Sequence, residues 1–507
     1  MKLKILDPPN RIEIESCTTD ELNKLIEIST AKRWSWQTKK YYEISYMSMF
    51  RFLPTGLYKR ILGLGKSGWN VDLVGLDKII SDVTNEELDE WIANEELKYA
   101  PRWYQFESFY KALKYRRSKF EIATSGGKSF IIAMITRWLL ENEIPEGGQI
   151  MIVTIRQMLV DQMIDDIYSY KKDNLIRYQA VYAGTEKIEN PNVIVGTYQS
   201  LSTWDKENFA NIHTIIVDEC HSAKIASIKD NILPKLNPNI CKRYLAFTGT
   251  MPDNDVDNLH LEAYFGPTVL KLTANELQEE GSIAKIKIKM IKMLYSLEQS
   301  KSYFFDEDVK TGGPTRLRAE RAWLHSNIER NKFIKDICAR FVGNIVILVE
   351  SVDYAKFLVE WLGTIEEKKV HLIYGGTKRN DRNEIKEELK LDEDNHILVA
   401  TYETMSTGVS INNIMAVMFP DGGKSRIRIR QSLGRGLRLH PKKDHLVVFD
   451  FWDKLKKQYE KKDKNGNVVV EGWPGPNSNI FDSHARIRKQ IYENEKFPYD
   501  VTEYVVK

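Results

Sequence analysis

Short apolar segments separated by helix-length spacers occur in two successive sets along this chain of 507 residues. Apolar runs of this length suit strands that are buried on both faces, as in a parallel sheet covered by helices. The runs are 119–123, 149–153, 192–195, 213–217 and 244–248 in the first set, and 344–349, 370–374, 396–401, 415–419 and 445–449 in the second. The pattern therefore predicts an α/β fold with two tandem parallel-sheet domains.

The length leaves room for smaller parts at both ends, because one hydrophobic core seldom serves more than ~250–300 residues. We expect a small α+β N-terminal domain at 1–95, sheet domains at 96–280 and 281–455, and a C-terminal extension at 456–507 packed on the second sheet domain. Lysine alternates with apolar residues along 283–289. This alternation fits either an edge strand that opens the second sheet domain or simply a strand with one solvated face.

The overall composition excludes several classes of protein. Hydrophobic residues make up 42% of the sequence and charged residues 29%, and the net charge of +3 is too small to identify a partner. The four cysteines are far apart and form no C-x-x-C pair, so neither a zinc site nor a disulfide framework is indicated. No secretory signal and no apolar stretch of ~20 residues is visible. We therefore expect a cytoplasmic protein with no membrane partner.

A phosphate site is predicted where the first apolar run meets a glycine-rich turn. The turn consists of Thr124, Ser125, Gly126, Gly127, Lys128 and Ser129. Backbone N–H groups at such a turn can cradle phosphates, the lysine adds positive charge, and the serine hydroxyl can hold magnesium. The full G-x-x-x-x-G-K-[ST] pattern fails, because Ile122 stands at its first glycine. An ordinary strand-to-helix turn is the alternative.

Asp218 and Glu219 supply the other half of an ATPase site. They directly follow the apolar run 213–217 in the same predicted domain. Phosphoryl transfer needs a metal ion on the phosphates and a positioned water, so we expect Asp218 to hold magnesium and Glu219 to polarise the water. The order and spacing of the two segments favour an ATPase site over a simple turn.

Two arginines in the second domain are candidates for a catalytic role. Arg435 and Arg438 are three residues apart and would share one face of a helix. We expect them to reach the γ-phosphate as arginine fingers, which would couple hydrolysis to closure of the cleft between the domains. The alternative is a basic helix that only binds surface acids.

The segment 29–60 combines positive charge with aromatic rings. It holds seven Lys and Arg residues, one acid and eight aromatic residues. Basic groups neutralise phosphates and aromatic faces stack on bases, so the N-terminal domain is predicted to bind nucleic acid. The alternative is that the aromatic side chains form the core of this small domain.

Six ordered segments resemble the motifs of the superfamily-two helicases, the DEAD/DEAH-like group with two RecA-like domains. They are 102–105, 123–129, 218–221, 248–250, 399–401 with 406–410, and 431–438. Short flanking segments at 53–57, 423–425 and 495–497, together with Trp91, resemble a phage recombination helicase. The resemblance therefore extends over almost the whole chain.

The resemblance implies ATP and magnesium as cofactors and adds further residues to the nucleotide site. Arg102 and Gln105 match the element that reads adenine. Gly408 and Gln431 match positions that contact the nucleotide from the second domain. The resemblance also gives 248–250 the task of linking hydrolysis to movement.

The resemblance also implies nucleic-acid contacts on the opposite edge of the sheets. Thr154, Gly196, Thr197 and Thr401 would offer backbone amides and hydroxyls to phosphates, which carries no sequence information. Lys424 begins the stretch 424–430, which has four positive charges. This stretch either extends the phosphate contacts or is a solvated basic segment.

The function implied by the resemblance is an ATP-dependent DNA helicase or branch-migration motor in recombination, repair and replication restart. Its expected partners are single-stranded and branched DNA and RNA–DNA hybrids, with the chain acting as a monomer and, if it is phage-encoded, in the host-cell cytoplasm. Two alternatives remain: a double-strand DNA translocase of a restriction system, and a nucleic-acid clamp that uses ATP as a switch.

Overall fold

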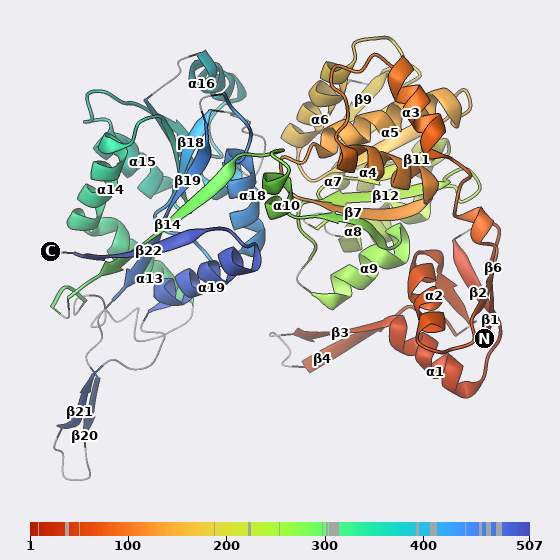
Figure 1. Cartoon of the computed structure of the whole chain (residues 1–507), viewed down its shortest axis with the longest axis horizontal. Coiled ribbons are helices and arrows are strands. Elements are labelled where there is room, and N and C mark those ends of the chain that lie inside the picture. Colours follow the sequence, from red (N-terminus) through yellow and green to blue (C-terminus); the bar gives the residue numbers. More distant parts are fainter. Residues whose placement is uncertain are drawn as a thin grey trace. The chain divides into compact units, whose positions relative to one another are not determined.

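The computed structural model of the chain divides by its internal contacts into two compact units, Met1–Leu272 and Thr273–Lys507 (Figure 1). The residues that it describes are 1–8, 10–35, 40–49, 51–186, 188–221, 225–252, 254–296, 298–300, 303, 314–391, 395–405, 413–441, 443–455, 459–462, 468–472 and 479–506.

A seven-stranded sheet forms the centre of the first unit, and all of its neighbouring strands run parallel. In spatial order the strands are β13 (Thr268–Leu272), β7 (Arg117–Ile122), β12 (Arg243–Thr248), β11 (Ile212–Val217), β8 (Gln149–Thr154), β10 (Val193–Thr197) and β9 (Tyr178–Val181). The central strands β7, β12 and β11 are buried along their whole length, as their continuous apolar runs predict.

Helices cover both faces of this sheet. Figure 1 shows α3 to α6 on one face and α8 and α9 on the other. The helices are α3 (Asn85–Asn94), α4 (Trp103–Lys114), α5 (Lys128–Asn142), α6 (Gln157–Tyr170), α7 (Tyr198–Ser202), α8 (Ile225–Asn231) and α9 (Asp255–Phe265), with 3-10 turns η3 (Lys206–Phe209) and η4 (Leu233–Lys235). Helix α5 is apolar all round because it is enclosed by its neighbours.

The N-terminal part of the first unit is a small α+β domain. Its mixed sheet has the order β5 (Phe52–Pro54), β2 (Arg11–Ser16), β1 (Lys2–Ile5) and β6 (Asp72–Val74). Helices α1 (Thr19–Ile28) and α2 (Tyr58–Lys66) and the 3-10 turns η1 (Thr55–Leu57) and η2 (Leu76–Lys78) complete it. The capping box of α1 pairs Thr18 with Glu21, which satisfies N–H groups at the helix start.

This N-terminal domain shares a hydrophobic core with α9. Val256, Leu259 and Ala263 of α9 lie in the same buried cluster as residues of α1, α2 and the mixed sheet. The N-terminal domain comes very close to α9 at Gly56, where a Cβ atom would lie 2.1 Å from the carbonyl oxygen of Glu262. A side chain at position 56 would therefore force the two surfaces apart.

The basic-aromatic segment of the N-terminal domain contains both buried and exposed aromatic residues. Strands β3 (Thr30–Ser35) and β4 (Lys40–Ser45) form an antiparallel hairpin. Tyr46, just after β4, packs into the shared core, and its hydroxyl forms a hydrogen bond with Nδ1 of His260. Tyr41 is 70% exposed, and Lys32, Arg33 and Lys40 on the hairpin are also exposed. The segment thus contributes to the core while its hairpin presents cations and a ring to solvent.

The second unit is built on another sheet of seven parallel strands. The strands in spatial order are β16 (Lys369–Ile373), β17 (His396–Thr401), β15 (Asn344–Val349), β18 (Ile414–Phe419), β19 (His445–Lys454), β14 (Lys285–Leu294) and β22 (Tyr499–Val505). The predicted fold, two tandem parallel-sheet domains preceded by a small α+β domain, is confirmed.

The expectation that 283–289 forms an edge strand is wrong. Strand β14 pairs with β19 on one side and with β22 on the other, so the edge is β22, close to the C-terminus. The alternation of lysine with apolar residues correctly indicates one exposed face. It cannot distinguish an edge strand from an inner one, because the hydrogen bonds to both neighbours are made by the backbone.

The remaining elements of the second unit are helices and one hairpin. The helices are α10 (Ala274–Glu279), α13 (Pro314–Ser326), α14 (Ile328–Arg340), α15 (Val352–Leu362), α16 (Arg379–Leu391), α17 (Tyr402–Met405), α18 (Arg426–Gly436) and α19 (Ile480–Asn494), and the hairpin is β20 (Tyr459–Lys462) with β21 (Val468–Gly472). The four cysteines of the chain are free thiols. Among the described residues, no helix has the length and apolarity needed to cross a membrane.

Candidate nucleotide and nucleic-acid site

The glycine-rich turn lies between β7, which ends at Ile122, and α5, which begins at Lys128. Gly127 is in the left-handed conformation with φ of 79°, and Ser125 has φ of 69°. A Cβ atom at Gly127 would lie 2.4 Å from Nε2 of Gln105. Both the backbone angle and the lack of space therefore require glycine here.

Gln105 connects the start of α4 to the glycine-rich turn. Its Oε1 accepts a hydrogen bond of 2.9 Å from the backbone N–H of Arg102, and its Nε2 donates one of 3.3 Å to the carbonyl of Gly126. Gln105 is buried, while Trp103 beside it is 55% exposed. The predicted adenine-reading pair thus lies against the predicted phosphate turn, and Gln105 holds that turn in place.

Lys128 and Glu219 meet at the carboxyl ends of β7 and β11. The Nζ of Lys128 lies 3.5 Å from Oε1 of Glu219 and donates a hydrogen bond of 3.4 Å to the carbonyl of Ile122. Both side chains are largely buried. The structure therefore brings together two of the catalytic residues predicted from separate segments.

Asp218 has the surroundings of a cation ligand. Its Oδ1 is buried and makes no hydrogen bond to any described residue. Burial, and then the negative charge of Glu219, raise the pKa of Asp218 to about 7, although Lys128 opposes this. A divalent cation would satisfy the buried oxygen and favour the ionised carboxylate, so the site fits magnesium.

Ser129, the other predicted magnesium ligand, points to a residue that the sequence does not identify. Its Oγ lies 3.0 Å from the hydroxyl of Tyr170, at the end of α6. Tyr170 lies far along the chain in a segment without a motif, so no sequence signal identifies it. Its hydroxyl would compete with a metal for Ser129.

A chain of contacts leads from Glu219 to the end of β12. The Nδ1 of His221 lies 3.4 Å from Oε2 of Glu219 and 2.5 Å from Oγ1 of Thr248. Thr248 Oγ1 in turn donates to the carbonyl of Thr250 at 2.9 Å. His221 therefore links the predicted water-polarising acid to the segment 248–250.

Thr154 and Thr197, two predicted nucleic-acid contacts, are register partners at the carboxyl ends of β8 and β10. They lie at the same end of the sheet as the glycine-rich turn, but further along the strand order, with β12 and β11 between β7 and β8. A backbone hydrogen bond of 2.9 Å from the N–H of Asp218 to the carbonyl of Val153 joins the two groups. Nucleotide and nucleic-acid candidates thus follow one another along one end of one sheet.

The local structure explains why two of these positions have small or capping residues. A Cβ atom at Gly196 would lie 2.9 Å from side-chain atoms of Leu201 and Val181. Thr197 is the N-cap of α7, and its Oγ1 accepts a hydrogen bond of 3.2 Å from the N–H of Ser200. Packing and capping therefore account for these residue types without any ligand.

In the second unit, Thr401 ends β17 and is buried, with its Oγ1 2.7 Å from Oγ1 of Thr404. Gly408 lies outside the described residues. Lys424 is exposed in the loop before α18, whose N-cap is Ser425. These placements leave the predicted nucleic-acid roles of Thr401 and Lys424 as predictions.

Three arginines of the stretch 424–430 form ion pairs with acidic side chains. Arg428 donates a hydrogen bond of 2.6 Å to Glu350, and Glu495 forms ion pairs with Arg426, at 3.5 Å, and with Arg430. Glu495, just after α19, is almost completely buried. These pairs fix the start of α18 to the sheet and to α19.

The end of α18 approaches the sheet closely. A Cβ atom at Gly436 would lie 2.8 Å from Leu446, so glycine lets the helix approach β19. Lys443 donates a hydrogen bond of 2.8 Å to the carbonyl of Gly436. Burial, and then the charge of Arg438, lower the pKa of Lys443 to about 8. Lys443 therefore lies near the positive charge of Arg438. Helix α18 ends at Gly436, so Arg438 lies beyond it, and the expectation that Arg435 and Arg438 share one face of a helix is wrong. The side chain of Arg435 is outside what the structure describes, and Gln431 lies on α18 one turn before Arg435.

Arg488 of α19 is a positioning residue that the sequence does not reveal. It is fully buried, pairs with Asp450 at 2.7 Å, and donates hydrogen bonds to the carbonyls of Gly422 and Gly423. Asp450 in β19 also accepts a hydrogen bond of 2.7 Å from Tyr492. This buried network fixes the loop that leads into α18.

Two family models match the chain. The model described as "Type III restriction enzyme, res subunit" matches residues 95–253, and the "Helicase conserved C-terminal domain" model matches residues 329–440. The two matches contain the site residues of the first and second unit respectively.

Individual proteins and solved structures also resemble the chain. The ATP-dependent DNA helicase uvsW of Enterobacteria phage T4 is 28% identical over 468 residues, which cover 89% of this chain and 87% of that protein. The crystal structure of T4 UvsW covers 100% of this chain and 99% of its own, with 23% identity and a TM-score of 0.47. A fragment of a putative HsdR subunit of a type I restriction enzyme from Vibrio vulnificus YJ016 has 17% identity and a TM-score of 0.56, covering 96% of this chain and 82% of its own.

Proposed function

The chain belongs to the superfamily-two helicases, and from this premise we propose that it is an ATP-dependent DNA helicase or branch-migration motor that acts on branched DNA and R-loops in recombination, repair and replication restart. The observation that carries the proposal is the 3.5 Å approach of Lys128 to Glu219, beside the unsatisfied buried oxygen of Asp218. This arrangement meets the needs of phosphoryl transfer within a helicase fold.

We propose distinct roles for the residues of the first unit. Lys128 and the N–H groups of the turn 124–129 would bind the nucleotide phosphates. Asp218 and Ser129 would hold magnesium, which supplies charge compensation at the phosphates when bound. Glu219 would accept the proton of the attacking water. Arg102 and Gln105 would lie at the adenine end of the nucleotide.

The second unit would complete the reaction. We propose that Arg435 and Arg438 stabilise negative charge that develops on the γ-phosphate, and that Gly408 and Gln431 contact the nucleotide from the same side. Lys443 lies close enough to Arg438 for the two positive charges to interact, so both side chains are candidates to meet a negatively charged phosphate. Hydrolysis would then require both units and would be coupled to their relative movement.

The proposed partners are single-stranded and branched DNA and RNA–DNA hybrids. Thr154, Gly196 and Thr197 of the first unit and Thr401 and Lys424 of the second would contact the phosphate backbone. Such contacts hold the strand without reading its sequence. We further propose that the chain works as a monomer in the cytoplasm of the host cell, as suits a relative of a phage helicase.

A second candidate function is supported by the family model of the first sheet domain. The description of that model names a restriction-enzyme subunit. The similar fold of a putative HsdR fragment agrees with this description. Under this alternative the chain would move along double-stranded DNA without separating its strands. The 28% identity to a DNA helicase over 89% of the chain favours strand separation.

A comparison of substrates tests the proposed function. We expect the purified chain with ATP and magnesium to separate or remodel forks, four-way junctions and R-loops faster than it acts on linear duplexes. Displacement of a triplex strand without fork unwinding would instead identify a double-strand translocase. ATP hydrolysis with neither activity would indicate an ATP-switched clamp, and would contradict the proposal.

The N-terminal hairpin β3–β4 gives a separate prediction about binding. Reversing two exposed charges, Arg33→Glu with Lys40→Glu, should weaken binding to forked DNA, because fewer phosphates are neutralised. Each lost contact should also reduce the slope of log affinity against log salt by ~0.7–0.9. Fluorescence anisotropy at several salt concentrations measures both effects.

The matched control reverses two exposed lysines elsewhere in the N-terminal domain, Lys4→Glu with Lys66→Glu. Equal losses in both double variants would show that only net charge matters. Point substitutions are preferable to deletion of the domain, because deletion would expose the apolar surface of α9 that the domain covers.

A further inference from the structure

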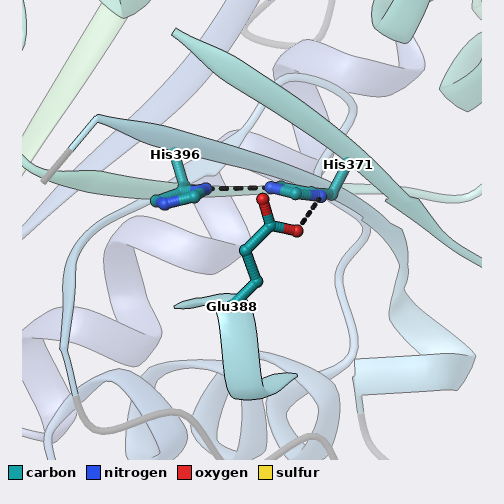
Figure 2. Close-up of side chains that lie close together, drawn as sticks. All are labelled: His371, Glu388 and His396. Atoms are coloured by element: carbon teal, nitrogen blue, oxygen red, sulfur yellow. Dashed lines mark hydrogen bonds and ion pairs between the residues drawn. The ribbon is translucent and has the colours of Figure 1, made fainter. Parts of the chain in front are cut away.

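Two histidines and a glutamate gather at one end of the sheet in the second unit, away from every residue discussed above. His371 lies in β16, Glu388 in α16, and His396 is the first residue of β17. Figure 2 shows the two imidazole rings facing one another with the carboxylate of Glu388 beside them. One ligand atom from each residue lies within 4.8 Å of the other two.

The shortest contacts in the group use different nitrogens of His371, while one ligand atom from each of the three residues lies within 4.8 Å of the others. The Nε2 of His371 lies 2.9 Å from Nδ1 of His396, and the Nδ1 of His371 lies 3.9 Å from Oε2 of Glu388. His396 is 1% exposed and the side chain of Glu388 is 42% exposed. The site therefore combines a buried ring with a carboxylate that reaches solvent.

The ligand set suits a zinc-class divalent ion. Imidazole nitrogens and a carboxylate oxygen are typical zinc ligands, and three protein ligands leave the fourth position for water. In a tetrahedral site with Zn–N bonds of about 2.0–2.1 Å, two nitrogens lie about 3.3–3.4 Å apart. The 2.9 Å contact between the rings therefore has to open by only a few tenths of an ångström.

At least one of the two histidines is available as a neutral ligand. A hydrogen bond between two imidazole rings requires an N–H on one and a lone pair on the other, so at least one ring is neutral. Burial lowers the pKa of His371 from its ordinary value, with Glu388 opposing this shift and His396 and Lys369 adding to it. Neutral rings are the form that binds metal ions.

The cation now nearest to Glu388 is Lys369. Its Nζ lies 3.3 Å from Oε1 of Glu388, and its side chain is well exposed. Exposed ion pairs of this kind contribute little free energy, so a metal ion would displace the ammonium group at small cost.

The position in the sheet separates this cluster from the nucleotide chemistry. His396 begins β17 and Thr401 ends it, so the cluster lies about 16 Å from the end that carries the predicted nucleic-acid contact. Ligand sites of parallel sheets form at the carboxyl ends of the strands, whereas this group lies toward the amino ends. A metal ion here would have a structural task.

We propose that His371, Glu388 and His396 bind one zinc ion, which fixes α16 to the edge strand β16 and to its neighbour β17. The ion joins residues from three elements, and β16 is the edge strand on this side of the sheet. Among the described residues, no other group of three or more His, Cys, Asp or Glu side chains converges in this way.

The test uses the full chain without a histidine tag, stripped of metal by a chelator. Titration with Zn²⁺ should show one bound equivalent by calorimetry, and Co²⁺ in its place should give the absorption bands of tetrahedral coordination. Glu388→Gln and His371→Gln should each weaken Zn²⁺ binding by at least about tenfold, since loss of even an outer-shell partner costs this much. Zn²⁺ should raise the melting temperature of the unaltered chain more than that of either variant.

Matched controls replace an exposed acid on the same helix, Glu387→Gln, and a histidine at the start of another strand, His445→Gln. Both should bind Zn²⁺ as the unaltered chain does. Circular dichroism before metal addition checks that every variant is folded. Absence of a bound equivalent, or equal affinity in the site variants and the controls, would overturn the proposal.

Discussion

Replacing Lys128 by alanine, or Glu219 by glutamine, is expected to lower nucleic-acid-stimulated ATP hydrolysis by roughly a hundred- to a thousandfold. Removing a preorganised charge from a water-poor site typically costs this much in rate, and loss of a general base costs as much. The two residues lie 3.5 Å apart in a largely buried position, so solvent cannot replace either one effectively. Steady-state phosphate release with and without single-stranded DNA measures the loss.

The two variants should differ in their binding of ATP. Lys128→Ala removes a phosphate contact and should weaken binding of a fluorescent ATP analogue, whereas Glu219→Gln should retain it. Lys271→Ala is the control, because Lys271 is an exposed lysine of β13 that pairs only with Glu121 among its charged neighbours in the described residues. Unchanged turnover in both site variants would contradict the proposed ATPase site.

The second large effect is expected from Arg435, on α18, and from Arg438, just after this helix. Arg438→Ala and Arg435→Ala should each lower the turnover number by about 10³–10⁵-fold, the range known for arginine fingers, while ATP binding changes much less. Burial of Lys443, and then the positive charge of Arg438, lower the pKa of Lys443 to about 8, so the two cations lie near one another.

Single-turnover hydrolysis with ATP in excess over its dissociation constant isolates this effect from binding. Arg340→Ala provides the control, since Arg340 is an exposed arginine at the end of α14. If Arg435→Ala and Arg438→Ala hydrolyse ATP at the rate of this control, the two arginines serve only to pair with surface acids. The alternative interpretation of the segment 431–438 would then be correct.

Most of the fold could be predicted from the apolar runs. Ten of the strands in the two parallel sheets coincide with such runs, because a strand buried on both faces has to be apolar along its length. Three of the four edge strands, β9, β13 and β22, were not predicted. Their outer sides meet solvent, as the mostly exposed residues of β22 show, so their sequences lack a continuous apolar run.

The nucleotide site could be predicted in part, because its turn needs residues with specific chemistry at fixed spacing. Lys128, Asp218 and Glu219 come together as their motifs imply, although their catalytic roles stay predictions. Tyr170 and Arg488 could not be predicted, since they act through contacts made far along the chain by ordinary helix residues. The sequence also did not reveal the cluster of His371, Glu388 and His396, because these residues come from three elements with no fixed spacing.

The hydrogen bond from Asp218 to Val153 has a mechanical consequence. It joins the two rows of candidate ligands across neighbouring strands of one sheet, so one row cannot move far without breaking hydrogen bonds that hold the other. The first unit is therefore expected to move as one rigid body, with no hinge between its candidate nucleotide-binding residues and its candidate nucleic-acid contacts. If the chain advances in steps, their length is set by the travel of one unit against the other, and it would be altered by changes to the linking segment near Leu272 more than by changes within either sheet.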